Sequence, residues 1–269
     1  MTSHLAETAA ALLGSRLAQA SALGGGDLSE IVRIDLADGR IAVAKGGPAP
    51  RIEAAMLEAI AACGVPAPSV LAAGDDVLVL EWLQADGHIA DAARDLGAVL
   101  ATLHRARGER YGWSEDYAFG PVRIINAWSD AWPAFWAEHR LLVHARWIDA
   151  PLARRLETLA GGIAQRLPAT PAASLLHGDL WSGNVLAAGR RITGLIDPAC
   201  YYGDAEVDLA MLTLFGDPGA AFATSYGALE AGYAERRPVY QLWPALVHLR
   251  LFGGGYRPLV ERLLAAARV

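Results

Sequence analysis

The sequence contains very little cysteine, since Cys63 and Cys200 are the only two among its 269 residues. Two cysteines provide no disulfide framework, so we expect a reduced, cytoplasmic setting. The first residues include Glu7 and lack a basic segment, and this predicts that no signal peptide is present. No uninterrupted apolar run of about 18 residues occurs, which predicts no membrane-spanning helix.

Positive charge is also scarce, because 23 Lys and Arg residues face 29 Asp and Glu residues, giving a net charge of -6. Nothing resembles the basic face of a nucleic-acid-binding protein, so we expect no nucleic-acid partner. An acidic chain can still bind ATP, because Mg²⁺ and a few local cations neutralise the phosphates. The composition is 54% hydrophobic and 19% charged, which allows a sizeable core and argues against wholesale disorder.

Two familiar site patterns are missing as well. The sequence has no G-x-x-x-x-G-K-[ST], and so it gives no support to a Walker-type nucleotide site. It has no H-E-x-x-H, and its histidines show no other metal-ligand spacing. Any nucleotide or metal site must therefore be built from other patterns.

The expected elements divide the chain into a strand-rich first third and a helix-rich remainder. We expect an α+β fold with two lobes, residues 1–83 and 84–269, joined by a hinge at about 81–85. In the first lobe we expect helices at 3–14 and 51–63 and strands within 15–23, 30–47, 69–74 and 76–83. In the second we expect helices at 89–107, 127–147 and 151–167, a strand pair formed by 174–180 and 184–197, and helices from about 205 with breaks at Pro218, Pro238 and Pro258.

The segment HGDLWSGN, residues 177–184, fits the kinase catalytic-loop pattern of His, any residue, Asp, Leu, three residues and Asn. In such a loop Asp179 reaches the acceptor hydroxyl, while Asn184 turns back to a metal ion on the phosphates. We expect His177 to orient the loop by hydrogen bonding. The alternative is a surface loop with an ordinary turn Asp and Asn.

An apolar strand delivers Asp197 thirteen positions after Asn184. A kinase-like site needs its main metal ligand there, close to the β- and γ-phosphates. The alternative is an Asp that ends a strand and caps a turn before Pro198. Because Pro198 stands where protein kinases have Phe, a flipping Phe switch is not available.

Lys45 ends the apolar strand RIAVAK and resembles the strand lysine of V-A-I-K, which pairs with the α- and β-phosphates. Glu53 falls eight residues later in the expected helix and could hold that lysine by an ion pair. Glu58 competes for this role, and an exposed helix glutamate is the alternative for Glu53.

Gly24, Gly25 and Gly26 lie between two expected strands. Glycines let backbone N–H groups approach phosphates, although a plain hairpin turn explains them as well. The order of glycine turn, strand lysine, helix glutamate, hinge, catalytic loop and metal aspartate favours a small-molecule kinase that uses ATP and Mg²⁺.

Several segments resemble the fructosamine kinase (ketosamine 3-kinase) family, within the wider aminoglycoside-phosphotransferase and protein-kinase-like fold. The most specific are LLHGDLWSGNV and IDPACYYGDAEVDLAM, with the Trp after HGDL, the Gly before Asn184 and the triplet DPA as the marks. Residues 25–30, 119–141 and 252–258 are also similar to family segments, so the resemblance covers most of the chain.

The resemblance implies a small β-rich N-lobe and a large helical C-lobe with ATP between them. It implies phosphorylation of a hydroxyl, typically O3, of a ketosamine or glycated amine, which destabilises the adduct and reverses glycation. Asp179 would be the catalytic base, Asn184 and Asp197 the Mg²⁺ ligands, and Lys45 and Glu53 the pair that anchors the phosphates. The backbone of Glu81, Trp82 and Leu83 would contact adenine.

The acceptor side is less well defined by the sequence. Trp181 could stack on the sugar ring, and Asp204 or Glu206 could contact the amine of the acceptor. Tyr256 and Arg257 could line the acceptor pocket, although packing roles are also open for them.

Two further aspartates are weighed through the resemblance. Asp208 either braces the catalytic loop, as in kinase-like folds, or is a plain charge at a helix N-terminus. Asp27 occupies what looks like the position of a cysteine that several family members carry, so redox-linked dimerisation through it should be absent.

Two alternatives to a ketosamine kinase remain open from the sequence. A kinase of the same fold could act on an aminoglycoside, choline or an amino sugar. A non-catalytic nucleotide-binding protein is the other, although the intact set of Lys45, Asp179, Asn184 and Asp197 argues against it. The sequence leaves the sugar, the amine and the oligomeric state undecided.

Overall fold

The computed structural model describes residues 4–24, 29–47 and 49–269. Gly25, Gly26 and Asp27, which belong to the expected glycine turn, lie outside the described residues. Gly24 is exposed, and a Cβ added to it would meet no atom within 4 Å. The described part of the turn therefore contains no close contact that requires glycine.

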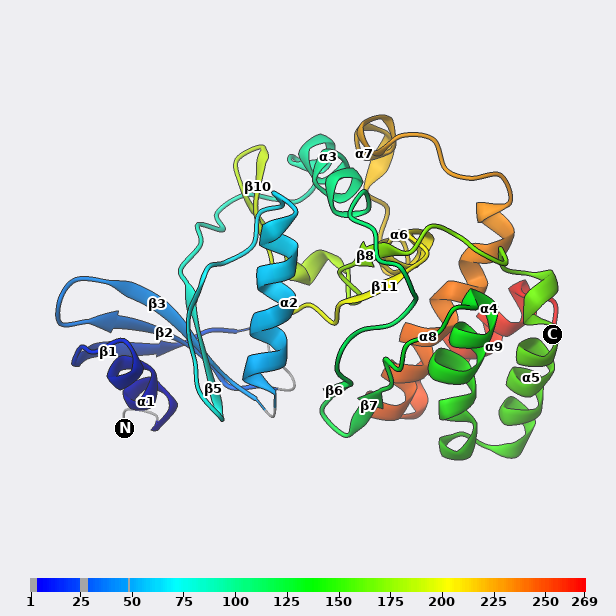
Figure 1. The fold of residues 1–269 in the computed structure, drawn as a ribbon, viewed down its shortest axis with the longest axis horizontal. Coiled ribbons are helices and arrows are strands. Elements are labelled where there is room, and N and C mark those ends of the chain that lie inside the picture. The colour runs from blue at the N-terminus through cyan, green and yellow to red at the C-terminus, as the bar shows by residue number, and fades with distance from the viewer. Residues whose placement is uncertain (1–3, 25–28, 48) are drawn as a thin grey trace.

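The first third of the chain forms a five-stranded antiparallel sheet in the order β1-β2-β3-β5-β4 (Figure 1). The helix α1 (His4–Leu12) packs on it through small buried residues such as Ala6 and Ala9, which meet Ile34, Ala42 and Val79. Gly39 turns the hairpin between β2 and β3 at φ +88°, as the Asp38-Gly39 pair predicts. The strands are β1 (Leu17–Ala22), β2 (Ile31–Leu36), β3 (Ile41–Gly46), β4 (Val70–Ala73) and β5 (Val77–Glu81).

The helix α2 (Pro50–Ala62) stands between the sheet and the rest of the molecule (Figure 1). One side of it packs Leu57 against Leu78 and Leu80 of β5. Another side places Met56 and Ile60 in a core that belongs mainly to the second part of the chain. Because α2 shares both cores, it fixes the position of the sheet relative to the helical part.

The remainder is mainly helical, and the predicted α+β class is confirmed. The expected helix at 127–147 begins only at Trp132 and changes geometry twice, with a π-helical turn in its middle. Its buried Trp132 and Trp136 pack with Tyr240 and Trp243 of the long helix α8. The helices and helical turns are α3 (Ala93–Leu103), α4 (Trp132–Trp136), η1 (Ala137–Leu141), η2 (Leu142–Trp147), α5 (Ala150–Gly161), η3 (Ile163–Gln165), η4 (Ser182–Asn184), α6 (Glu206–Leu212), α7 (Gly219–Tyr226), α8 (Tyr233–Phe252), η5 (Gly254–Tyr256) and α9 (Arg257–Ala266).

The short strands of this part pair differently from the expectation. β9 (Val185–Ala188) and β10 (Arg191–Leu195) form a hairpin, whose turn at Gly189 has φ +54°. β8 (Ser174–Leu176) pairs instead with β11 (Tyr201–Gly203), so the predicted pairing of 174–180 with 184–197 is wrong. The hairpin β6 (Tyr117–Phe119) and β7 (Val122–Ile124) was not expected.

Prolines mark helix boundaries at two of the three expected places. Pro218 is the N-cap of α7, and Pro258 lies in the first turn of α9. The predicted break at Pro238 is wrong, because α8 continues through Pro238 and also through Pro244. A proline costs a helix one backbone hydrogen bond, and the continuous buried run from Val239 to Val247 stabilises α8 despite this loss. None of the helices in the described ranges is long and apolar enough to cross a membrane.

Candidate active site

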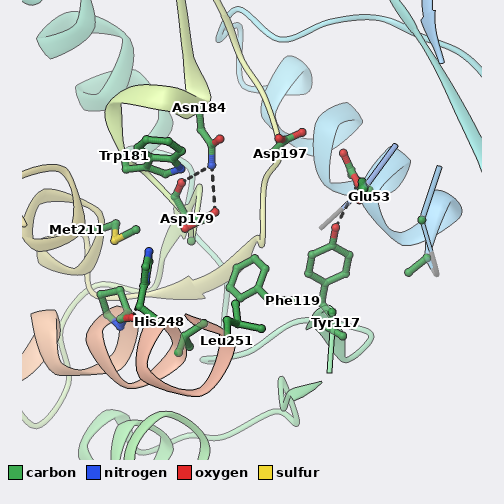
Figure 2. Close-up of a pocket in the computed structure, with 18 of the residues that line it drawn as sticks. Glu53, Tyr117, Phe119, Asp179, Trp181, Asn184, Asp197, Met211, His248 and Leu251 are labelled. Atoms are coloured by element: carbon green, nitrogen blue, oxygen red, sulfur yellow. Dashed lines mark hydrogen bonds between the residues drawn. The ribbon is translucent and has the colours of Figure 1, made fainter. Parts of the chain in front are cut away.

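A cleft of about 470 Å³ lies between the sheet and the helical part. Its lining includes Lys45, Glu53, Asp179, Asn184 and Asp197, which come from β3, α2, the loop after β8, η4 and the segment after β10. Figure 2 shows four of these, Glu53, Asp179, Asn184 and Asp197, around one cavity. The fold thus brings together the polar residues that the sequence motifs single out.

Lys45 is held by two carboxylates at the inner end of β3. Its Nζ lies 2.6 Å from Glu53 Oε1 and 2.8 Å from Asp197 Oδ1, although Asp197 is 152 residues away in sequence. Burial opposes the charge on Lys45, but the attraction of Glu53 and Asp197 outweighs it and raises the pKa of the amine. The lysine is therefore a fixed cation in the cleft. Glu58, the competing partner, is exposed on the same helix.

The catalytic loop follows β8 through a turn that only glycine fits. Gly178 has φ +81°, and a Cβ there would lie 2.0 Å from the carbonyl oxygen of Ala199. Asp179 comes next, and Asn184 Nδ2 donates hydrogen bonds to its backbone O at 2.8 Å and to its Oδ2 at 3.0 Å. Burial raises the pKa of Asp179 to about 7, while the hydrogen bond from Asn184 opposes this shift.

Asp208 lies beneath this loop at full burial. It accepts hydrogen bonds from the backbone N–H groups of His177 at 2.7 Å and Gly178 at 2.9 Å. His104 Nε2 donates to the same carboxylate at 3.1 Å. Asp208 therefore ties α6 and α3 to the catalytic loop.

His177 is also occupied by the loop itself. Its Nε2 donates to the carbonyl of Ile196 at 2.9 Å, and its Nδ1 accepts from the backbone N–H of Asp179 at 3.3 Å. Burial lowers the pKa of His177, which keeps the ring neutral. With both nitrogens used, the ring orients the loop and has no free position to act as a base.

Asn184 and Asp197 offer oxygen ligands side by side. The backbone N–H of Ile196 donates to the carbonyl of Asn184 at 3.0 Å, which places Asp197 next to Asn184. The side-chain nitrogen of Asn184 donates its hydrogen bonds to Asp179, so the Oδ1 of Asn184 is the atom left to bind a cation. Asp197 adopts the left-handed φ of +54°, a conformation that is uncommon for non-glycine residues and recurs at active sites.

These donors fit Mg²⁺, which is commonly held by one or two protein oxygens together with substrate phosphates and waters. Within the described ranges, no group of three or more His, Cys, Asp or Glu side chains could hold a metal ion by itself. A magnesium ion in this cleft would therefore depend on phosphate oxygens as well as on Asn184 and Asp197.

Tyr117 is a cleft residue that the sequence reasoning missed. Its hydroxyl donates to Glu53 Oε2 at 3.2 Å, so the β6–β7 hairpin contacts α2 across the cleft (Figure 2). Burial and the nearby Glu53 carboxylate raise the pKa of Tyr117, which remains a neutral donor. No local pattern indicates this contact, because its partners are 64 residues apart and meet only in the folded chain.

Three predicted acceptor residues do not reach the cleft. Asp204 accepts a hydrogen bond from Tyr240 at 2.7 Å, and Glu206 is paired with Arg236 at 2.7 Å. Arg257 is bonded to Asp149 and Glu261 on the surface. Each of the three is bonded to a partner outside the cavity lining, so their contact with the acceptor gains no support and stays a prediction.

Trp181 and Tyr256, the other two predicted acceptor residues, do line the cleft. The indole of Trp181 is 39% exposed and lies beside Asp179 (Figure 2). A Cβ at Gly183 would lie 2.3 Å from this ring, so the loop packs its glycine against the indole. One face of the indole is thus supported by the protein.

The expected adenine segment follows directly from β5. The backbone N–H of Glu81 donates a hydrogen bond to the carbonyl of Ser69 at 2.9 Å, and Glu81 Oε2 accepts one from the Ser69 hydroxyl at 2.8 Å. Trp82 lies under Arg33, and Leu83 packs against Gly194 of β10. None of Glu81, Trp82 and Leu83 belongs to the lining of the 470 Å³ cleft, so their contact with adenine stays a prediction.

The antiparallel sheet, the helical lobe and the cleft between them define a protein-kinase-like fold. A crystal structure of an aminoglycoside phosphotransferase, APH(4)-Ia in a ternary complex with AMP-PNP and hygromycin B, shares this fold. Its TM-score is 0.65 at 18% identity, with 99% of this chain and 97% of that chain covered.

A family model described as fructosamine kinase matches residues 1–267, and the chain belongs to this family. It is 41% identical over 232 residues to a probable ketoamine kinase of Synechocystis sp., covering 79% of this chain and 76% of that protein. It is similar to a crystal structure described as a candidate fructosamine-3-kinase from Thermobifida fusca YX-ER1, with a TM-score of 0.89 at 31% identity. That match covers 100% of this chain and 99% of the other.

Proposed function

We propose that this protein is an ATP- and Mg²⁺-dependent kinase that phosphorylates a sugar hydroxyl, O3, of a ketosamine such as a fructosamine or ribulosamine. The observation that carries the proposal is the convergence of Lys45, Glu53, Asp179, Asn184 and Asp197 on one cleft. Relatives named as ketoamine kinases support the acceptor class, and the AMP-PNP complex of the aminoglycoside phosphotransferase supports the nucleotide.

The residues of the chain divide the work of phosphoryl transfer. Asp179 accepts the proton of the attacking hydroxyl, and the amide of Asn184 fixes its carboxylate in place. Lys45 contributes a fixed positive charge to the phosphates, and Glu53 prevents it from turning away. Magnesium, held through Asn184 and Asp197, would supply charge neutralisation of the phosphates. Trp181 offers a flat apolar surface to the sugar ring.

Phosphorylation of O3 destabilises the adduct between sugar and amine, so the proposed reaction serves deglycation in the cytoplasm. We assign residues 1–83 to the lobe that holds the nucleotide phosphates and residues 84–269 to the lobe that holds the acceptor. Adenine would then lie near the backbone of Glu81, Trp82 and Leu83, where the two lobes join.

Mass spectrometry of a ketosamine panel incubated with ATP and Mg²⁺ tests the proposal. We expect a mass increase of one phosphoryl group on fructosamines or ribulosamines, formed at a much lower rate by the Asp179→Asn variant. NMR of the product then locates the phosphate on O3. Turnover of aminoglycosides, choline or amino sugars without turnover of any ketosamine would show that the proposed acceptor class is wrong. Nucleotide binding without turnover of any acceptor would show that the protein is not a kinase.

A further inference from the structure

The cleft continues beyond Asp179 along a wall of aromatic side chains. The imidazole of His248 lies at its centre, with ring centroids 5.3 Å from Phe215, 5.4 Å from Phe252 and 4.9 Å from Tyr256. All four residues line the cavity, together with Leu251. Phe215 and Phe252 remain 49% and 44% exposed, so large apolar surfaces are left uncovered at the cleft. We call Phe215, His248, Leu251, Phe252 and Tyr256 the aromatic wall.

His248 presents a hydrogen-bond acceptor in this wall. Its Nδ1 lies 2.8 Å from the carbonyl oxygen of Pro244, and a carbonyl can only accept, so Nδ1 carries the proton. Burial lowers the pKa of His248, which keeps the ring neutral and leaves a lone pair on Nε2. Among the described residues Nε2 has no hydrogen-bond partner. Figure 2 shows His248 and Leu251 rising from α8 toward Asp179.

The aromatic wall contains no ionic side chain. Lys45 is the only lysine or arginine among the described residues that line the cleft, and it is already paired with Glu53 and Asp197. The arginines next to the wall in sequence have other partners. Arg250 lies 4.8 Å from the ring centroid of Trp147, and Arg257 is paired with Asp149 and Glu261. A carboxylate bound at this wall would lose its hydration without gaining a cationic partner.

We propose that the aromatic wall binds the amine half of the ketosamine and selects amines with an apolar substituent and no carboxylate. This inference rests on the proposed function, because it assumes that the sugar half lies between Asp179 and Trp181. The protonated secondary amine donates a hydrogen bond to His248 Nε2, and its positive charge is attracted by the surrounding rings. The substituent on the amine covers the exposed surfaces of Phe215 and Phe252.

A series of acceptors that differ only in their amine tests the selectivity of the aromatic wall separately from the kinase reaction. Three adducts of one sugar are compared by kcat/KM: those of methylamine, phenethylamine and phenylalanine. The phenethylamine adduct should exceed the methylamine adduct by about tenfold, because its ring leaves water on binding. The phenylalanine adduct differs from it by one carboxylate and should be poorer by about tenfold or more, because that charge is desolvated without a partner.

Two variants then assign the selectivity to its residues. Phe252→Ala should reduce the phenethylamine-to-methylamine ratio severalfold, and Leu71→Ala, an equally exposed apolar residue on the sheet, should leave the ratio unchanged. His248→Phe keeps a ring but removes Nε2, so KM should rise for both amine adducts while kcat changes little. His248→Gln, which returns an acceptor, should recover part of the lost affinity.

The outcomes separate the two proposals. If all three adducts are phosphorylated with equal kcat/KM, or if Phe252→Ala leaves the ratio unchanged, the aromatic wall is not the amine subsite although the kinase assignment stands. If the phenylalanine adduct is preferred, the exclusion of carboxylates is wrong. If no ketosamine is phosphorylated, the proposed function fails and this inference fails with it.

Discussion

At the scale of single residues, two aspartates in one cleft have different hydrogen-bond partners. Asp197 is paired with the Lys45 ammonium at 2.8 Å, whereas Asp179 is held by the neutral amide of Asn184. The first arrangement places a carboxylate beside the expected metal and phosphates. The second leaves a carboxylate whose pKa is raised to about 7 by burial, which suits a group that accepts a proton near neutral pH.

Replacing Asp179 by Asn should lower kcat by about 10²- to 10⁴-fold, the range typical for the loss of a general base. The side chain keeps its size, so the melting temperature should change little. Steady-state kinetics and thermal unfolding measure the two quantities, with exposed Asp76→Asn as the matched control. Wild-type turnover in Asp179→Asn would remove this residue from the mechanism.

His144 provides a prediction on stability that is independent of the cleft. Burial, with Arg250 and Arg140 nearby, lowers the pKa of His144 to about 3, whereas an unfolded histidine titrates near its ordinary value of 6.5. The unfolded chain therefore binds a proton first, and stability is lost as pH falls from about 6.5 toward 3. From this residue the free energy of unfolding should lose about 3 kcal/mol between pH 6.5 and 4.

Denaturant unfolding at a series of pH values checks this linkage. His144→Gln carries no titrating group, so its stability should fall less steeply over the same interval than that of the wild type. Parallel slopes for the two proteins would show that His144 does not contribute to the pH dependence.

At the scale of elements, the β6–β7 hairpin connects the two sides of the cleft. Tyr117 of β6 bonds Glu53 of α2, and Glu53 bonds Lys45 of β3, so three elements meet in one chain of hydrogen bonds. Phe119 and Gly120 of the same hairpin line the cavity. The position of the hairpin is therefore linked to the orientation of Lys45, the lysine that we propose anchors the phosphates.

Tyr117→Phe removes the hydroxyl and keeps the ring. The loss of one hydrogen bond to a carboxylate is worth about 1.5–3 kcal/mol at most, so we expect KM for ATP to rise severalfold, with a smaller change in kcat. Kinetics with ATP as the varied substrate measure this split. A double-mutant cycle with Glu53→Gln should show non-additive effects, and strict additivity would contradict the coupling.

At the scale of the whole molecule, the candidate site lies between the sheet and the helical part, because its lining comes from both. Figure 1 shows these two bodies of structure. The sheet contributes Lys45, and the helical part contributes Asp179, Asn184 and Asp197. Part of the contact between the two bodies is made by α2, whose Met56 and Ile60 share the core of the helical part. A ligand that binds both sides of the cleft should therefore stabilise the molecule as a unit.

The magnesium complex of AMP-PNP should raise the melting temperature of the protein. At 100 times the dissociation constant the stabilisation is about 2.7 kcal/mol, which corresponds to a shift of about 5 °C or more for a chain of this size. Differential scanning fluorimetry measures the shift, and EDTA should reduce it. Lys45→Met should show a smaller shift than wild type, and equal shifts would exclude Lys45 from phosphate binding.

Much of the fold could be predicted from patterns of near neighbours. The hairpin at Asp38-Gly39, the strand that ends at Lys45 and the helix that carries Glu53 follow from turn chemistry and hydrophobic spacing. The wrong predictions concern features that depend on packing between residues distant in sequence. The strands that flank the catalytic loop pair with other partners, and α8 continues through Pro238 because its buried residues outweigh a lost hydrogen bond.

The sequence by itself was enough to single out Lys45, Asp179, Asn184 and Asp197 as candidate site residues. Each stands in a motif that is recognised by the order and separation of residues along the chain. Only the tertiary structure decided that Asp204 and Glu206 turn away from the cleft, and that Tyr117 and His248 enter it. A side chain's direction depends on the elements packed against it. Those elements come from distant parts of the chain, so a local sequence pattern does not predict which of them will pack together.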